Sequence, residues 1–336
     1  LNFPYVKEFI KFYYLFVPII FNFLFIYVLV SFFNFKKKIE YISLLPFVFS
    51  VPVLLAVERA NIDILIFLFV YLISIKKNLV VNYIVIIITT ITKFYPVILM
   101  VIFLFKKNFK QIFLHSLILI LFISIVLFLE IEDLKKIFTN RKLIFASGHS
   151  AFSLIISLEY FNNFKIKLNN SDYTFVKYLF IFIILIIPII FTLIKSRKNI
   201  FSNHAIKNLI LINNYENRLY ILSSTVIIIC FFVFKNHIYR EIFFLGLIPW
   251  ILKEKNNSDI NNFSSFLYYL LCFKFLFSTF VIYLNRNDIF PLIKPFITIG
   301  KHSLDIFVVF IILLTFITAL ISLFSELFKK ESISDI

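Results

Sequence analysis

The residues with the clearest capacity for chemistry interrupt two apolar stretches of the chain. In the first stretch, VERANIDILIF at 57–67, the ionisable side chains are Glu58, Arg59 and Asp63. In the second, TKFYP at 92–96, the ionisable side chain is Lys93. A charge near the centre of a bilayer disfavours insertion by about 2.5–3.5 kcal/mol, so such residues usually face a protein-lined cavity and carry function. Glu58 and Arg59 alone fit a polar turn equally well, but with Asp63 and Lys93 the pattern favours one active site.

This combination of side chains suits a lipid-linked phosphate substrate. A carboxylate can accept the proton of an attacking hydroxyl, and Lys or Arg can neutralise a phosphate leaving group. We therefore expect Glu58 and Asp63 to be catalytic and Lys93, Arg240 and Arg59 to bind the donor phosphate. The predicted acceptor or sugar contacts are Asn61, Tyr95, His237, Tyr239 and Glu241. The alternative is that Lys93 and Arg240 only pair with the carboxylates of Asp63 and Glu241.

Composition predicts an all-α, polytopic integral membrane protein with a single domain over residues 1–336. The chain is 61% hydrophobic and only 15% charged, with a mean hydropathy of +0.98. Apolar runs recur along its whole length, and lipid requires each spanning segment to satisfy its own backbone. The net charge of +16 comes from short basic clusters between these runs, as the positive-inside rule requires, so we expect no nucleic-acid partner.

Basic clusters such as Lys36 to Lys38 assign one side of each run to the cytoplasm. The residues from 79 to 105 lie between two basic clusters, which favours two half-helices that meet at Lys93 and Pro96 instead of one span. Together the runs predict about eleven membrane segments: 9–33, 41–57, 62–75, two half-helices within 79–105, 111–129, 175–194, 219–234, 242–252, 263–284 and 303–324. The predicted site residues then all lie on the extracytoplasmic side of the cytoplasmic membrane.

The longest polar stretch, 130–173, is predicted to be an extracytoplasmic loop with an interfacial helix over 151–161. Cys230 and Cys272 lie in apolar runs and indicate neither a disulfide framework nor a metal site. Glycine-rich phosphate loops and metal-ligand clusters are absent from the sequence, so we expect no cofactor and no metal. His302 and Asp305 share a helix face at this spacing, and a packed polar pair is the favoured interpretation.

Three segments together resemble a known enzyme family: ERANIDILIF at 58–67, TKFYPVIL at 92–99 and HIYREIFFLGLIPWIL at 237–252. The first is similar to a polar break that opens a span, the second to a Lys-x-x-Pro motif, and the third to a Tyr-Arg segment before an apolar span with proline. Their order and spacing resemble glycosyltransferase family 87, the polyprenol-phosphate-mannose-dependent mannosyltransferases of the GT-C membrane fold.

The resemblance implies sugar transfer from a polyprenyl-phosphate donor to an envelope glycan or glycolipid on the outer face of the membrane, with inversion. Two features depart from the family pattern. Ala60 stands where relatives often have Gly, and the catalytic aspartate of GT-C enzymes lies in a first outer loop that would precede Leu1. We therefore expect an upstream segment with the main base, and the base within this chain stays open between Glu58 and Asp63.

Two other functions compete with the glycosyltransferase. An O-antigen-type polymerase also has many spans, but its catalytic residues would lie mainly in the 130–173 loop. A transporter or lipid flippase also uses broken helices, but it predicts charges along a path through both leaflets and an internal repeat. The ionisable residues in the helix breaks favour the transferase.

Overall fold

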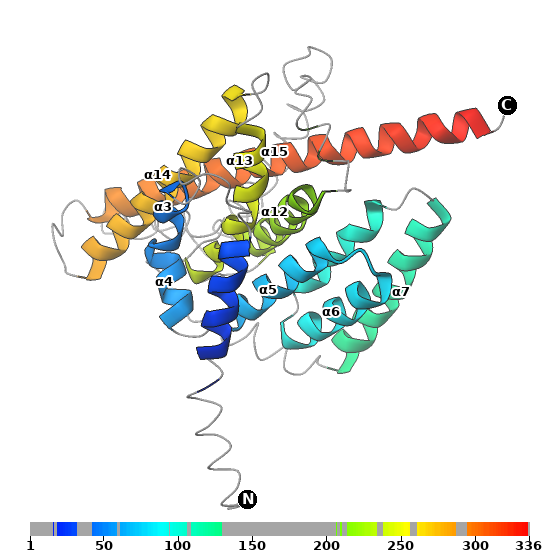
Figure 1. The fold of residues 1–336 in the computed structure, drawn as a ribbon, viewed down its shortest axis with the longest axis horizontal. Helices are drawn as coiled ribbons and strands as arrows, with labels where there is room; N and C mark the ends of the chain where they lie inside the picture. The colour runs from blue at the N-terminus through cyan, green and yellow to red at the C-terminus, as the bar shows by residue number, and fades with distance from the viewer. Residues whose placement is uncertain are drawn as a thin grey trace, which may run out of the picture.

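The computed structural model describes residues 16, 19–31, 42–58, 61–93, 95–105, 109–129, 206, 209, 214–233, 238–255, 261–286 and 294–334. These residues form helices and short connections, with no strand among them, as the all-α prediction requires. The central element is α12 (Tyr215–Val233), which packs against five other described segments, α5, η1, η3, α13 and α15. Helices α6 and α7 lie on one side of α12, and α3, α4 and α14 lie on the other (Figure 1).

The sequence predicted one helix over 41–57, and this prediction is wrong. It forms α3 (Leu45–Val48) and α4 (Val51–Glu58), with a break at Phe49 and Ser50. Pro52 has no backbone N–H and a fixed φ, which suits the first turn of a helix, so a new helix starts here. The N–H of Val51 donates instead to the hydroxyl of Thr279 in α14, at 3.1 Å.

Helix α5 (Ile62–Ile75) has the predicted bounds, and α6 (Leu79–Thr92) begins at the predicted residue. Both helices follow an asparagine cap. The side chain of Asn61 accepts from the N–H of Asp63 at 3.0 Å. Helix α6 ends at Thr92 with Lys93 as its C-cap, and the 3-10 helix η1 (Tyr95–Phe105) follows and packs back against it. The predicted break at Lys93 is therefore confirmed.

The remaining helices are α7 (Phe109–Leu129), the 3-10 helix η3 (Ile238–Leu247), α13 (Ile248–Lys255), α14 (Asn261–Arg286) and α15 (Lys294–Ser334). Helix η3 packs against α12, α4 and α5. Arg218, near the start of α12, is buried and donates to the backbone oxygens of Ile73 and Lys76 at the end of α5. Orphan carbonyls at a helix end need such partners, and Arg218 thereby joins the two helices.

Helices α12 and η3 pack closely at Gly246, where η3 has no side chain between the two backbones. A Cβ added there would lie 2.0 Å from Oγ of Ser223 and 2.9 Å from its Cβ. Small residues that let two backbones approach closely are common where helices associate in membranes. The Gly246–Ser223 contact therefore fixes how near η3 can come to the central helix.

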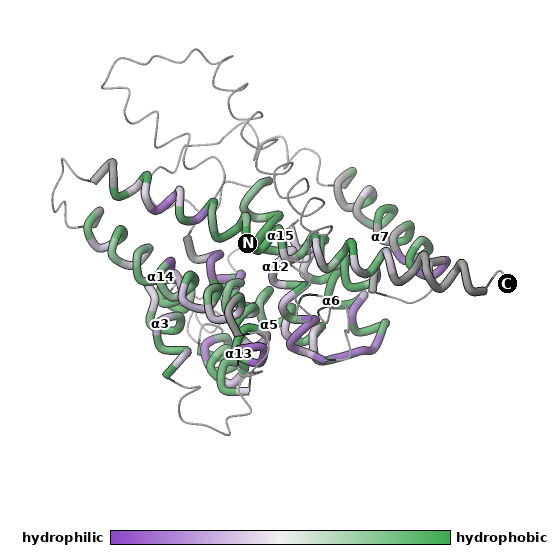
Figure 2. Tube along the Cα trace, turned by 90° about the horizontal axis from the view of Figure 1, so that it is seen from above, coloured by the Kyte–Doolittle hydropathy of each residue, from purple (hydrophilic) through white to green (hydrophobic). Residues whose placement is uncertain are grey.

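Two described helices are long and apolar enough to cross a membrane, Phe263–Leu284 and Ile297–Ser325. The prediction of eleven membrane segments is therefore not confirmed. Figure 2 shows hydrophobic residues along most of the described parts of α7 and α14. The predicted loop at 130–173 and the predicted span at 175–194 lie outside the described residues.

Candidate functional site

The site is built around Asp63, which lies in the first turn of α5 and is fully buried. Its Oδ1 accepts from Nζ of Lys93 at 2.6 Å and from the hydroxyl of Tyr95. Its Oδ2 lies 3.7 Å from Nε of Arg240. We call these four residues the Asp63 group. The two stretches predicted to form one site, and the arginine predicted to join them, therefore meet at a single carboxylate.

Three helix breaks or ends position these side chains. Asp63 follows the Asn61 cap of α5, Lys93 lies between α6 and η1, and Tyr95 begins η1. Arg240 lies in η3, and its guanidinium carbon is 5.0 Å from the centre of the Tyr95 ring, within range of a cation–π contact. Because η1 and η3 both pack on α12, the central helix keeps the contributing segments together.

The Asp63 group has an excess of positive charge, and its cationic side chains are more exposed than its carboxylate. With Lys93 and Arg240 protonated and Asp63 ionised, two cations face one anion. The side chains of Lys93 and Arg240 are 21% and 15% exposed, whereas that of Asp63 is 0% exposed. The two cationic side chains therefore keep part of their surface accessible, whereas the carboxylate does not. Nε and Nη1 of Arg240 are buried and make no hydrogen bond within the described part of the chain.

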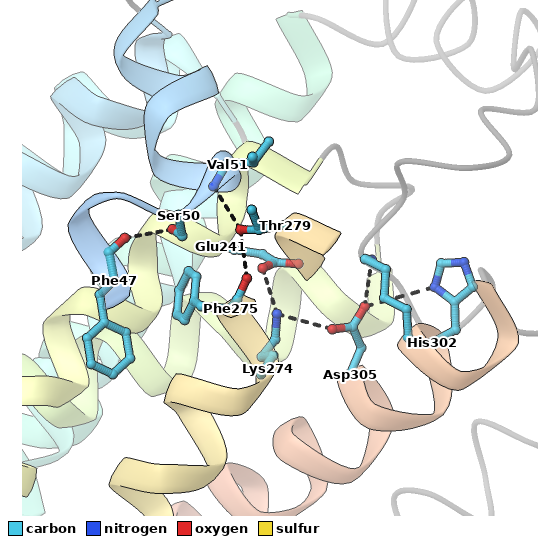
Figure 3. A network of polar contacts seen from close by, with 10 residues as sticks. Phe47, Ser50, Val51, Glu241, Lys274, Phe275, Thr279, His302 and Asp305 are labelled. Carbon is cyan, nitrogen blue, oxygen red and sulfur yellow. Dashed lines mark hydrogen bonds and ion pairs between the residues drawn. The ribbon is translucent and has the colours of Figure 1, made fainter. Parts of the chain in front are cut away.

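A second set of ionisable residues lies on the other side of η3. Lys274 in α14 is 2.6 Å from Oε2 of Glu241 and 3.1 Å from Oδ1 of Asp305. Asp305 in α15 is also 2.9 Å from Nζ of Lys301 and 3.9 Å from Nδ1 of His302. Figure 3 shows Lys274 between Glu241 and Asp305. We call Glu241, Lys274, Lys301, His302 and Asp305 the Lys274 group.

The two groups differ in charge balance and in burial. The two lysines of the Lys274 group match its two carboxylates when His302 is neutral, and all five residues are buried. A balanced and closed network holds helices together without offering a charge to a ligand. The packed pair predicted for His302 and Asp305 is confirmed as part of this network. The Asp63 group is therefore the better candidate for binding.

Other predicted site residues lie in different surroundings. Glu58 is exposed at the end of α4, and no ion pair among the described residues joins it to Asp63, Lys93 or Arg240. Asn61 is occupied as the cap of α5. Glu241 is fully buried and bound to Lys274. In the alternative of structural pairing, the carboxylate that pairs with both Lys93 and Arg240 is therefore Asp63, not Glu241.

Some predicted residues cannot be placed in the site. Arg59 and His237 lie outside the described residues, and for Tyr239 only the backbone, within η3, is described. Within the described ranges, no three His, Cys, Asp or Glu residues form a metal-binding group. The candidate chemistry is therefore that of two cations, one buried carboxylate and one phenol.

Sequence reasoning missed Lys274 and Lys301. Lys274 is an isolated lysine in the middle of the apolar run at 263–284, and such a residue is by itself a signal of function or of a buried partner. Lys301 and Asp305 are four residues apart, which places them on one helix face. The predicted start of the last span at Ser303 concealed this pairing, since α15 begins at Lys294.

Comparison of the chain with protein-family models, curated proteins and solved structures gives no match.

Proposed function

We propose that this chain is a membrane-embedded glycosyltransferase that takes a sugar from a polyprenyl-phosphate donor and transfers it to an envelope glycan or glycolipid. The observation that carries the proposal is the Asp63 group, in which the partly exposed side chains of Lys93 and Arg240 are both paired with one fully buried carboxylate. Fixed cations at the place where negative charge develops on a departing phosphate are an efficient form of catalysis. The choice of mannose as the sugar rests on the resemblance to family 87.

Placement of the chain in a membrane is supported by the surface of α14. Its exposed residues are large and apolar, recur every three or four positions and are 48–60% exposed: Phe266, Tyr269, Phe273, Leu276, Phe280 and Tyr283. The buried face of the same helix carries Ser264, Lys274 and Ser278. A polar interior with an apolar exterior suits lipid, because an exposed apolar stripe of this length is unfavourable in water. We place the site on the extracytoplasmic face of the cytoplasmic membrane.

The proposed reaction is a single displacement, with inversion at the sugar. An acceptor hydroxyl oxygen attacks the anomeric carbon, the bond from that carbon to the phosphate oxygen breaks, and polyprenyl phosphate leaves with the electron pair. Lys93 and Arg240 stabilise the phosphate as its charge grows. The hydroxyl proton passes to a carboxylate within hydrogen-bond reach.

The burial of Asp63 favours a holding role for this residue over direct proton transfer. Its two oxygens face Lys93, Tyr95 and Arg240, and none of its surface is exposed. Of the two carboxylates predicted to be catalytic, Glu58 is the accessible one. In this proposal Asp63 orients the two cations, and Glu58 is the candidate base within the chain.

The test uses farnesyl phosphate as the ligand and farnesol as its uncharged control, with purified protein in detergent micelles. We expect the chain to bind the phosphate more tightly than the alcohol. The variants Lys93→Met and Arg240→Met should each weaken phosphate binding by about one to two decades, because each removes a charge-assisted contact of about 1.5–3 kcal/mol. Binding of farnesol should not change.

Lys253→Met is the matched control, since Lys253 forms a partly exposed ion pair with Glu216, 3.6 Å away, at the ends of other helices. It should bind farnesyl phosphate as the unaltered chain does. Equal affinity for the phosphate and the alcohol, or folded Lys93→Met and Arg240→Met proteins with unaltered affinity, would remove the Asp63 group from donor binding.

The Lys274 group favours a second candidate, an ion-coupled transporter. Lys274 and Asp305 lie inside the two helices that are long and apolar enough to span a membrane, and intramembrane ionisable residues often line ion or proton paths. Proteoliposomes with a pH gradient separate the two functions. Proton uptake that depends on Asp305 would support the transporter. Proteoliposomes that take up no protons but bind farnesyl phosphate specifically would support the transferase.

A further inference from the structure

The neighbouring residues Arg240 and Glu241 face two different charged groups. Arg240 points to Asp63, whereas Glu241 is bound by Lys274 at 2.6 Å. Both residues lie in the first turns of η3. A rotation of η3 about its own axis would therefore move both side chains together, and whatever fixes one of them also restricts the other.

The contacts of Arg240 within its own group are weak. Its Nε is 3.7 Å from Oδ2 of Asp63, which is beyond the usual range of a hydrogen bond. Neither Nε nor Nη1 has a hydrogen-bond partner among the residues that the structure describes. The position of the guanidinium is therefore set largely by the backbone of η3 and by the Tyr95 ring, 5.0 Å from its carbon.

The contacts of Glu241 are strong by comparison. Its partner Lys274 is fully buried in α14, and the same ammonium group reaches Asp305 of α15 at 3.1 Å. The Lys274 ammonium also lies 4.7 Å from the centre of the Phe244 ring in η3. A buried ion pair that loses one partner leaves an uncompensated charge, so such a pair resists displacement. Lys274 therefore anchors η3 to the two long helices.

We propose that Lys274 and Glu241 form a positioning pair, which fixes η3 so that the Arg240 guanidinium faces the donor phosphate beside Lys93. Neither member touches the donor in this scheme. The phosphate part of the proposal rests on the proposed function, whereas the placement of Arg240 does not. Lys274 thereby links the interior of the long helices to the geometry of the Asp63 group.

Lys301→Met is the matched control for Lys274→Met. Both lysines are buried, and both contact Asp305. Only Lys274 contacts Glu241. A merely structural role for the network predicts similar losses in both variants. A positioning role predicts a specific effect of Lys274→Met on Arg240.

The first measurement is the rate at which phenylglyoxal modifies Arg240 in the full chain, followed by mass spectrometry, with an added arginine-containing peptide as the reference. Lys274→Met and Glu241→Gln should change the ratio of the Arg240 rate to the reference-peptide rate by at least about threefold, since release of η3 alters access to the guanidinium. Lys301→Met and the conservative Lys274→Arg should leave the ratio near that of the unaltered chain. An unaltered ratio in folded Lys274→Met and Glu241→Gln proteins would overturn the positioning pair.

The second measurement is the affinity for farnesyl phosphate. Lys274→Met and Glu241→Gln should weaken it on the order of tenfold, the size of a lost charge-assisted contact, and Lys274→Arg should restore most of it. An equal loss in Lys301→Met would also overturn the proposal. If Arg240→Met itself leaves farnesyl phosphate affinity unaltered, the proposed donor site fails, and the phenylglyoxal ratio still decides whether Lys274 positions Arg240.

Discussion

At the residue scale, Asp63 provides the opposite charge for two partly buried cations. Lys93 comes from the end of α6 and Arg240 from η3, and each has Asp63 as an ion-pair partner. Without the carboxylate, two cations and the Tyr95 hydroxyl would face one another in a largely buried space. Removal of one member of a buried pair costs more than the pair contributes, since it leaves an uncompensated charge.

Asp63→Asn should therefore destabilise the chain by about 3–5 kcal/mol. The loss should be visible as a lower midpoint of thermal unfolding in detergent. The double variant Asp63→Asn/Lys93→Met should be more stable than Asp63→Asn alone, since the second change removes one uncompensated cation. Asp63→Asn protein that unfolds at the temperature of the unaltered chain would show that the ion pairs contribute little to the fold.

At the scale of the elements, the site depends on how closely η3 and η1 pack on α12. Both are 3-10 helices of ten or eleven residues, and such lengths are uncommon because the hydrogen-bond geometry is poorer than in an α-helix. Long 3-10 stretches often mark functional segments, and here these two provide Tyr95 and Arg240. Packing against α12 compensates for the weaker helical hydrogen bonds.

Gly246→Ala should destabilise the chain by about 1–3 kcal/mol, the usual cost of an overpacked contact. The reason is that the added methyl would lie 2.0 Å from Oγ of Ser223. Gly300→Ala is the matched control, because its Cβ would meet Phe277 no closer than 3.7 Å. It should be neutral or slightly stabilising, since alanine favours helix over glycine.

Both variants are compared by thermal unfolding, together with Gly246→Ala/Ser223→Gly. The second change removes the side chain that the new methyl would meet, so the double variant should recover part of the lost stability. Equal unfolding midpoints for Gly246→Ala and Gly300→Ala would show that α12 and η3 can separate at no cost.

The two-segment arrangement of α6 and η1 also predicts their orientation in a membrane. Because η1 packs back against α6, reporter fusions after Lys77 and after Lys110 should report the same side, and basic clusters at both positions assign that side to the cytoplasm. Alkaline phosphatase and green fluorescent protein fusions distinguish the two compartments. Reporters on opposite sides would mean that 79–105 crosses the membrane once.

At the scale of the whole molecule, polar and apolar residues are arranged as expected for a protein in lipid. The central helix α12 buries Asn217, Arg218 and Ser223, whereas α14 exposes large apolar residues. Two of the helices that the structure describes have the length and composition of membrane spans. At about 1.5 Å per residue, the 22-residue span in α14 covers about 33 Å, enough for a hydrocarbon core of about 30 Å.

Phe273→Asp tests this arrangement directly, because Phe273 is one of the exposed residues of α14. In lipid the new charge should disfavour insertion by about 2.5–3.5 kcal/mol, and less protein should remain in alkali-washed membranes. Asn78→Asp, in the exposed connection between α5 and α6, is the control and should insert normally. A Phe273→Asp protein with normal yield and improved solubility would place the α14 face in water.

The sequence alone determined the local features of this protein. Helix caps at Asn61 and Asn78, the bounds of α5, the start of α6 and the break at Lys93 follow from side-chain types and spacing, since neighbouring residues decide them. Two members of the charged site, Asp63 and Lys93, could also be selected, because ionisable residues are costly in an apolar run. Tertiary structure decided which charges pair, because residues 30 to 180 positions apart meet only when helices pack. It placed Arg240 on Asp63 and its neighbour Glu241 on Lys274, a division that depends on the packing of η3 between α5 and α14 and that no local pattern encodes.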